Sequence, residues 1–66
     1  MTIREKAYMI WGYYRMRLNF YERNLLKKLL GGIQGLGDIN DEQIKEYLTE
    51  GQVGWIKKLG LKFKIT

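Results

Sequence analysis

The sequence has 66 residues and lacks cysteine, histidine, serine and proline. Without cysteine it can form no disulfide, and without cysteine and histidine it cannot assemble the usual ligand set of a zinc site. The Ser–His and Cys–His pairs that act as nucleophiles in many enzymes are excluded as well. The carboxylates of residues 38–50 crowd one short segment, where helix-end electrostatics explains them. We therefore expect a protein that is not an enzyme and holds neither a metal nor a cofactor.

Long apolar runs are missing too. The uncharged stretch AYMIWGYY in the aromatic region has eight residues, whereas a membrane-spanning helix needs about 20. The N-terminal residues MTIREK do not have the apolar core of a secretory signal. These absences predict a chain with no transmembrane segment and a cytoplasmic location.

The chain length predicts a single small domain over residues 1–66. Domains of this size bury only about 60% of the surface that the unfolded chain exposes, and many need a disulfide, a metal or oligomerisation for stability. Because disulfides and a Cys/His zinc site are excluded, we expect a homo-oligomer or a partner to contribute.

Residues 3–30 carry the longest periodic pattern. One apolar stripe follows steps of three and four residues, the spacing of one helix face, and it contains Ile3, Ala7, Ile10, Tyr14, Leu18, Tyr21, Leu25 and Leu29. A second stripe, on nearly the opposite side, contains Met9, Tyr13, Met16 and Phe20. The pattern predicts a long N-terminal amphipathic helix whose second stripe is covered by a dimer partner or a target protein.

A shorter pattern in the same region favours strands. The stretch YRMRLNF, residues 14–20, alternates between apolar and polar residues, and its aromatic neighbours are also common in β structure. The tail LKFKIT, residues 61–66, alternates in the same way and predicts a short strand. A lone strand leaves its backbone groups unpaired, so it would need an edge from a partner. An N-terminal hairpin about Gly12 would supply that edge within the chain.

Two shorter helices are predicted in the second half of the chain. In NDEQIKEYLTEG, Asn40 is a typical N-cap with Gln43 three residues later, which is the spacing of a capping box, and Gly51 is a stop signal. In QVGWIKKLG, apolar residues recur at helical spacing and Gly60 is the predicted terminator. The predicted fold class is mostly α, with a long N-terminal helix, two shorter helices and a short C-terminal strand. The alternative is an α+β fold in which the N-terminal hairpin pairs with that strand.

The segment LGGIQGLGDI, residues 30–39, holds four of the eight glycines. The spacing of Gly32 and Gly37 matches a P-loop, but an aspartate and an isoleucine follow where that loop needs lysine and a hydroxyl residue. We interpret the segment as a turn, in which Gly31 and Gly32 stop the preceding helix. Gly35 and Gly37 would then permit a positive φ in the connection.

The stretch IQGLGDINDEQIKEYL, residues 33–48, resembles a helix-hairpin-helix module, in which a glycine-containing turn joins two helices. The apolar and glycine positions of that motif fall on Ile33, Gly35, Leu36, Gly37 and Ile44. The resemblance implies binding to nucleic-acid backbones without sequence preference, through turn amides and flanking basic residues. The chain departs from that pattern by carrying acids after the turn, which would repel a phosphate, at Asp38, Asp41 and Glu42.

Charge is divided among three parts of the chain. Residues 1–33 hold seven basic and two acidic residues, a net charge of +5. Residues 38–50 hold one lysine and five acids, a net charge of −4, and residues 51–66 hold four lysines, a net charge of +4. All four arginines lie in the first part, mixed with tyrosine and tryptophan. Such a mixture suits phosphates and stacked bases, and it is also common in protein interfaces.

These features predict a small basic protein that binds without catalysing a reaction. The first hypothesis is a small regulator of the mobile-element type that contacts the nucleic-acid phosphate backbone through Arg15, Arg17, Arg23, Lys27, Lys28, Lys57, Lys58, Lys62 and Lys64. The alternative is a protein inhibitor or adaptor that binds a host protein through Met9, Tyr13, Met16 and Phe20. Phosphate contacts lose affinity steeply as salt rises, so salt dependence separates the two hypotheses.

Overall fold

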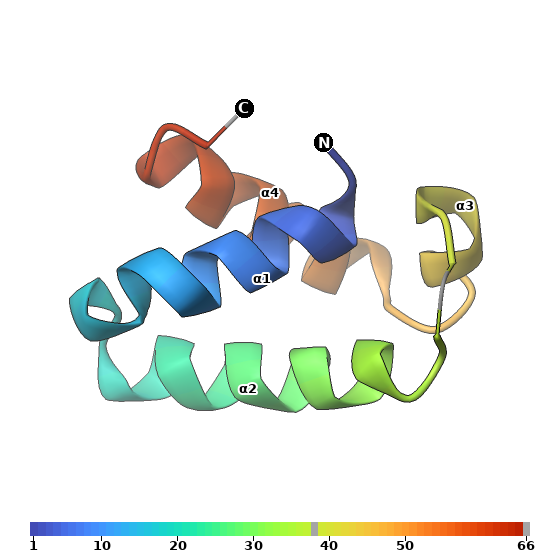
Figure 1. Cartoon of the computed structure of the whole chain (residues 1–66), viewed down its shortest axis with the longest axis horizontal. Coiled ribbons are helices and arrows are strands. Elements are labelled where there is room, and N and C mark those ends of the chain that lie inside the picture. Colours follow the sequence, from blue (N-terminus) through green and yellow to red (C-terminus); the bar gives the residue numbers. More distant parts are fainter. Residues whose placement is uncertain (38, 66) are drawn as a thin grey trace.

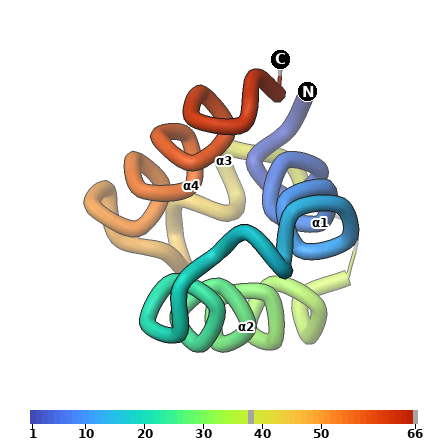
Figure 2. Tube along the Cα trace, turned by 90° about the vertical axis from the view of Figure 1, so that its left-hand side faces the viewer, coloured from blue at the N-terminus to red at the C-terminus, as the bar shows by residue number. Residues whose placement is uncertain are grey.

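The computed structural model describes residues 1–37 and 39–65. Within these residues the chain forms α1 (Ile3–Tyr14), the 3-10 helix η1 (Arg15–Arg17), α2 (Phe20–Gln34), α3 (Asp41–Ile44) and α4 (Glu50–Lys62). The predicted mostly α class is therefore confirmed. α1 and α2 lie side by side in opposite directions, and α3 lies at the end away from their connection (Figure 1). Viewed from the side of that connection, α1, α2 and α4 stand at three corners around the core (Figure 2).

A side-chain cap starts each α-helix. The capping side chain accepts a hydrogen bond from the backbone N–H three residues later, and the caps are Thr2, Asn19, Asn40 and Thr49. At the start of α2, Glu22 N–H donates to Asn19 at 2.7 Å, and the Glu22 carboxylate accepts the Asn19 N–H at 3.0 Å. This capping box starts a new helix at residue 20. The single long helix predicted for residues 3–30 is therefore wrong.

The corner between α1 and α2 takes the place of the strand that YRMRLNF favoured. Leu18 follows η1 in an extended conformation and is buried. Met16 and Phe20, which share its side in the alternating pattern, are 80% and 76% exposed. The alternation therefore does not separate a buried face from an exposed one. The alternative N-terminal hairpin is wrong, because Gly12 lies inside α1.

The C-terminal strand predicted for the tail is not formed in residues 61–65. α4 continues into this tail, and Gly60, which was predicted to end it, lies inside the helix. The chain then turns through Lys64, which has a φ of 57°. Lys64 N–H donates to the Leu61 carbonyl at 3.1 Å, and Ile65 N–H donates to the Gly60 carbonyl at 2.7 Å. These two bonds define a Schellman motif, in which the residue with positive φ is usually glycine.

The glycine-rich segment is a turn, as predicted, but the turn is shorter than expected. Gly31 and Gly32 continue α2 instead of stopping it, and Gly35 caps the helix with a φ of −70°. Gly37 has a φ of 73°, a conformation in which a Cβ atom is unfavourable. Asp38 lies outside the described residues.

The second predicted helix is much shorter than its pattern suggested. The capping box of Asn40 and Gln43 is present, with bonds of 2.9 and 3.0 Å. The α-helical part nevertheless ends at Ile44, and Gly51 lies in the first turn of α4 instead of ending the preceding helix. A helix this short places one buried side chain, Ile44, in the core.

The short helix α3 is tied to the start of α1. The Asp41 carboxylate accepts a hydrogen bond from the Ile3 backbone N–H at 2.8 Å. The Gly37 carbonyl accepts another from the Arg4 guanidinium. A carboxylate at a helix N-terminus is stabilising, because the free N–H groups there carry partial positive charge. Asp41 therefore has a structural use within this fold.

The core takes at least one completely buried side chain from each α-helix. Ile10, Leu26, Ile44 and Ile56, one from each, have no exposed surface, and α1 packs against α2, α3 and α4. Tyr21, although it belongs to the predicted apolar stripe, is 71% exposed, because the break at the corner changes the direction of the helix.

Within the part of the chain that the structure describes, no helix is long and apolar enough to span a membrane.

We predict that Gly37→Ala and Gly35→Ala differ in stability. Gly37→Ala should lower the free energy of unfolding by about 1 kcal/mol or more, because the new Cβ is unfavourable at positive φ. Gly35→Ala should have little effect, because its φ is negative and a Cβ there would meet the Gly32 carbonyl oxygen at an ordinary 3.6 Å. Urea denaturation of both variants measures the difference. Equal losses would contradict the described turn.

Candidate functional site

Two aromatic rings fix the end of α4 on the corner between α1 and α2. The rings of Tyr14 and Phe63 stack with their centroids 4.7 Å apart and their planes inclined by 9°. Phe63 and Ile65 are both buried, so the turn that follows α4 is held against the core. This packing places side chains from opposite ends of the sequence beside one another.

Three basic side chains surround the stacked rings. The guanidinium carbon of Arg17 lies 5.8 Å from the centroid of the Phe63 ring, and Lys62 Nζ lies 5.5 Å from it. Arg17, Lys62 and Lys64 line one open depression together with the two rings. We call these three residues the basic cluster. Three cations on one small surface create a positive potential that attracts anions.

Arg15 extends the positive charge along the corner. It precedes Met16 and Arg17 on η1 and is exposed. Its guanidinium carbon lies 5.3 Å from the centroid of the Trp11 ring. A guanidinium that rests against a ring keeps its N–H edge available for the oxygens of a phosphate.

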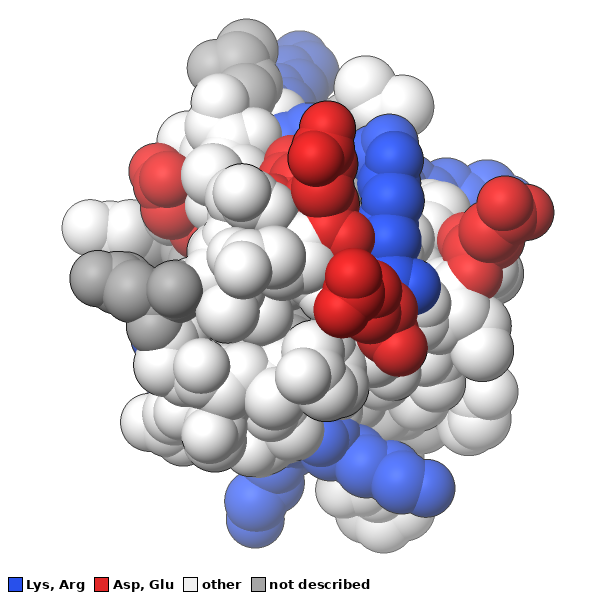
Figure 3. Space-filling model, turned by 90° about the vertical axis from the view of Figure 1, so that its right-hand side faces the viewer, with Lys and Arg blue, Asp and Glu red and all other residues white. Residues whose placement is uncertain are grey.

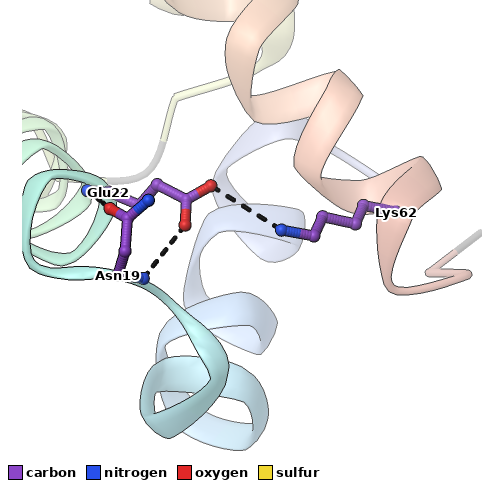
Figure 4. A network of polar contacts seen from close by, with 3 residues as sticks. All are labelled: Asn19, Glu22 and Lys62. Atoms are coloured by element: carbon purple, nitrogen blue, oxygen red, sulfur yellow. Dashed lines mark hydrogen bonds and ion pairs between the residues drawn. The ribbon is translucent and has the colours of Figure 1, made fainter.

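Glu22 is the acid that meets the basic cluster. Its Oε2 lies 3.9 Å from Lys62 Nζ, while the same carboxylate caps α2 through the Asn19 N–H (Figure 4). The Glu22 side chain is 17% exposed and that of Lys62 is 56% exposed. Because Lys62 is more than half exposed and the two atoms are 3.9 Å apart, this pair adds little stability. Its larger effect is electrostatic, because Glu22 reduces the positive charge that Lys62 can offer to an anion.

The other predicted phosphate contacts do not line this depression. Lys58 lies one turn before Lys62 on the same face of α4. Arg23, Lys27 and Lys28 are distributed along α2, where Lys27 lines a separate depression with Trp11 and Leu30. Lys57 lines another with Lys45 and Glu50, and Lys58 is exposed on α4. The structure thus brings together Arg17, Lys62 and Lys64 from the predicted set, with Arg15 adjacent in the chain.

Four of the acidic residues lie in a different part of the structure from the basic cluster. Residues 41–50, which include α3, the turn after it and the start of α4, hold four carboxylates. Figure 3 shows several acidic side chains on the side of the molecule that carries α3, with Lys and Arg side chains among them. The connection between α1 and α2 lies at the opposite end (Figure 1). The acids of residues 41–50 therefore lie away from that connection, although lysines such as Lys45 and Lys57 lie among them.

The predicted partner surface is divided by the fold. Met9 is half-buried and packs against the core. Tyr13, Met16 and Phe20 are 77%, 80% and 76% exposed, and they lie at the end of α1, on η1 and at the start of α2. We call these three residues the apolar corner; the connection that carries them faces the viewer in Figure 2. Large exposed apolar side chains close together in the chain make this segment a candidate binding surface.

Two parts of this site, the pair of stacked rings and Glu22, were not predicted from the sequence. Tyr14 and Phe63 build the surface on which the cations meet, and only the folded chain brings these two residues together. Glu22 could have been found, because Asn19 and Glu22 have the same capping-box spacing as Asn40 and Gln43.

Neither metal chemistry nor a relative identifies the site. Among the residues with described positions, no group of three or more His, Cys, Asp or Glu side chains could hold a metal ion. Comparisons with protein-family models, with curated proteins and with solved structures find no match. The resemblance of residues 33–48 to a helix-hairpin-helix module gains no support from them. The function must therefore be inferred from the surface of the chain itself.

We predict that Lys64→Gly stabilises the protein. A residue other than glycine in the left-handed region costs about 1 kcal/mol, and Lys64 holds that conformation with a φ of 57°. Glycine should raise the free energy of unfolding by about that amount, which corresponds to several degrees in Tm for a domain of this size. Lys64→Ala, which removes the charge without relieving the backbone, is the control. Equal stability of the two variants in thermal and urea denaturation would contradict the left-handed conformation described for Lys64.

Proposed function

We propose that this chain binds the phosphate backbone of nucleic acids through the basic cluster. The observation that carries the proposal is that Arg17 lines one depression with Lys62 and Lys64, although it is far from these two lysines in the sequence. A cation surface that serves only solubility needs no such convergence. Contacts to phosphate fix the position of a protein on its ligand but read no bases. We therefore expect binding without sequence preference.

The backbone of Lys64 supports this proposal independently. The turn after α4 has the hydrogen bonds of a Schellman motif, and glycine would be the less strained residue at its left-handed position. The chain carries instead a lysine whose side chain lines the same depression as Arg17 and Lys62. Backbone strain of this kind is commonly found at functional sites. A role of the Lys64 side chain in binding would explain why a lysine and not a glycine stands at this position.

The size of the cluster sets the expected strength of binding. Three cations, with Arg15 as a fourth, would displace about three or four counterions from a duplex, which gives a slope of about −3 in a plot of log K against log salt. Binding without base contacts has dissociation constants of about 10⁻⁴ to 10⁻⁶ M at physiological salt. The acidic side around α3 would face away from the ligand. A regulatory role in a mobile element stays a prediction.

A protein partner is the second candidate ligand, and the apolar corner favours it. Tyr13, Met16 and Phe20 offer ring and thioether surface of the kind that anchors protein interfaces. An inhibitor or adaptor that uses this corner would bind its target with little dependence on salt. Self-association through the same residues would show the same insensitivity.

Removing two cations from the cluster should weaken binding to every nucleic-acid sequence alike. We expect Arg17→Gln combined with Lys62→Gln to reduce the salt slope by about 2, because each phosphate contact contributes about 1. Fluorescence anisotropy with labelled duplexes of two unrelated sequences, at several salt concentrations, measures this slope.

The matched control is Lys45→Gln combined with Lys57→Gln, which removes the same charge beside Glu50. This control should change the slope little. Equal effects of the two double variants would show that binding follows the net charge and not the basic cluster, which would overturn the proposal.

Glu22→Gln should raise the affinity for nucleic acid severalfold. Glutamine can keep the capping bond, since Gln43 and Gln52 accept the same bond from Asn40 and Thr49 in this chain. The change therefore removes the negative charge beside Lys62 and leaves the start of α2 intact. Glu46→Gln, the same change in the acidic part of the chain, is the control. An affinity gain of the same size in both variants would contradict a specific effect of Glu22.

A further inference from the structure

Three aromatic rings near the connection between α1 and α2 are mostly exposed and bury little surface in the core. Tyr13, Phe20 and Tyr21 are 77%, 76% and 71% exposed, within one short segment that also carries Met16. Single exposed apolar residues are normal on protein surfaces, but a group of them needs an explanation. Contacts to phosphate alone do not explain them, because a phosphate is recognised by charge and by N–H groups and not by a ring.

The arginines near these rings restrict which kind of ligand can cover them. Arg15 and Arg17 lie on η1 between Tyr13 and Phe20, and Arg23 follows on the first turns of α2. Glu22, the acid of this segment, is engaged with Asn19 and Lys62. A symmetric dimer would bring the same patch of both copies together, and with it both sets of arginines. The corner is therefore better matched to a polyanion than to a second copy of itself.

Single-stranded nucleic acid offers both of the groups that exposed rings beside arginines can bind. Its phosphates carry the negative charge, and its unpaired bases expose flat faces that stack on aromatic side chains. A duplex offers the same phosphates but keeps its base faces stacked inside. Rings beside arginines are the usual composition of surfaces that hold a single strand.

We infer that the ligand is a single strand, with its phosphates at the basic cluster and at Arg15 and its bases stacked on Tyr13 and Phe20. This inference rests on the proposed function, since it names the form of nucleic acid that the same surface takes. Binding would depend little on base identity, because every base has a face that can stack.

The test compares one single strand with one duplex of the same length. Anisotropy titrations with a labelled 12-nucleotide oligothymidine and a 12-base-pair duplex, at about 50 mM salt, should give an affinity about tenfold or more in favour of the single strand. Tyr13→Ala combined with Phe20→Ala should weaken oligothymidine binding by about tenfold or more and leave duplex binding within about twofold. Both side chains are exposed, and thermal melting checks that the variant folds.

Tyr47→Ala is the matched control, because Tyr47 is a ring that is 61% exposed on the acidic side of the chain. It should leave both affinities unchanged. If both ligands bind equally and the double variant loses neither, the proposed function stands and the single-strand inference is overturned. If neither ligand binds, the proposed function itself fails.

Sedimentation of the same proteins tests whether a second copy of the chain covers these rings instead. We expect the sedimentation of the free chain to be unchanged by the double variant. If the variant instead converts a dimer into a monomer while oligothymidine affinity stays the same, the corner is a self-association surface and the inference is overturned.

Discussion

The stacking of Phe63 on Tyr14 builds the surface on which the basic cluster lies. The two rings join the end of α4 to the corner between α1 and α2, and Ile65 buries the turn that follows. The buried residues of α4 already hold that helix against α1, and the stacked rings add a contact beside Arg17 and the lysines of the tail. Side chains far apart in the sequence thereby line a single depression. The candidate site is thus a consequence of core packing.

The remaining charges fit the same arrangement. The acids of residues 41–50 lie around α3, where Asp41 accepts a hydrogen bond from the first N–H of α1. Asp41, Glu42 and Glu50 lie in the first turns of helices, where negative charge is favourable. Glu22 differs from them, because its position in a capping box holds it beside Lys62. Glu22 therefore serves both helix capping and the electrostatics of the basic cluster, and the strength of the proposed binding should depend on its charge.

Local signals in the sequence predicted the helical class and the cap at Asn40. The sequence also contains capping signals that the prediction from apolar periodicity did not use. Asn19 and Thr49 carry the same capping-box spacing, and they mark the starts of α2 and α4. The apolar stripe was misleading because its spacing continues across the corner, although the chain there changes direction. Nothing local predicts Lys64 at positive φ, since glycine is the expected residue. The meeting of Tyr14 with Phe63 depends on the tertiary packing of the whole chain.

A chemical-shift titration of the isotope-labelled protein with a short oligonucleotide tests the central claim most directly. The 7.9 kDa chain is small enough for every backbone amide to be followed. Binding at the basic cluster predicts that the largest changes occur at residues 13–21 and 61–65, and that they diminish together as salt is added. Changes centred on residues 33–48, or none at all, would contradict the assignment of the site.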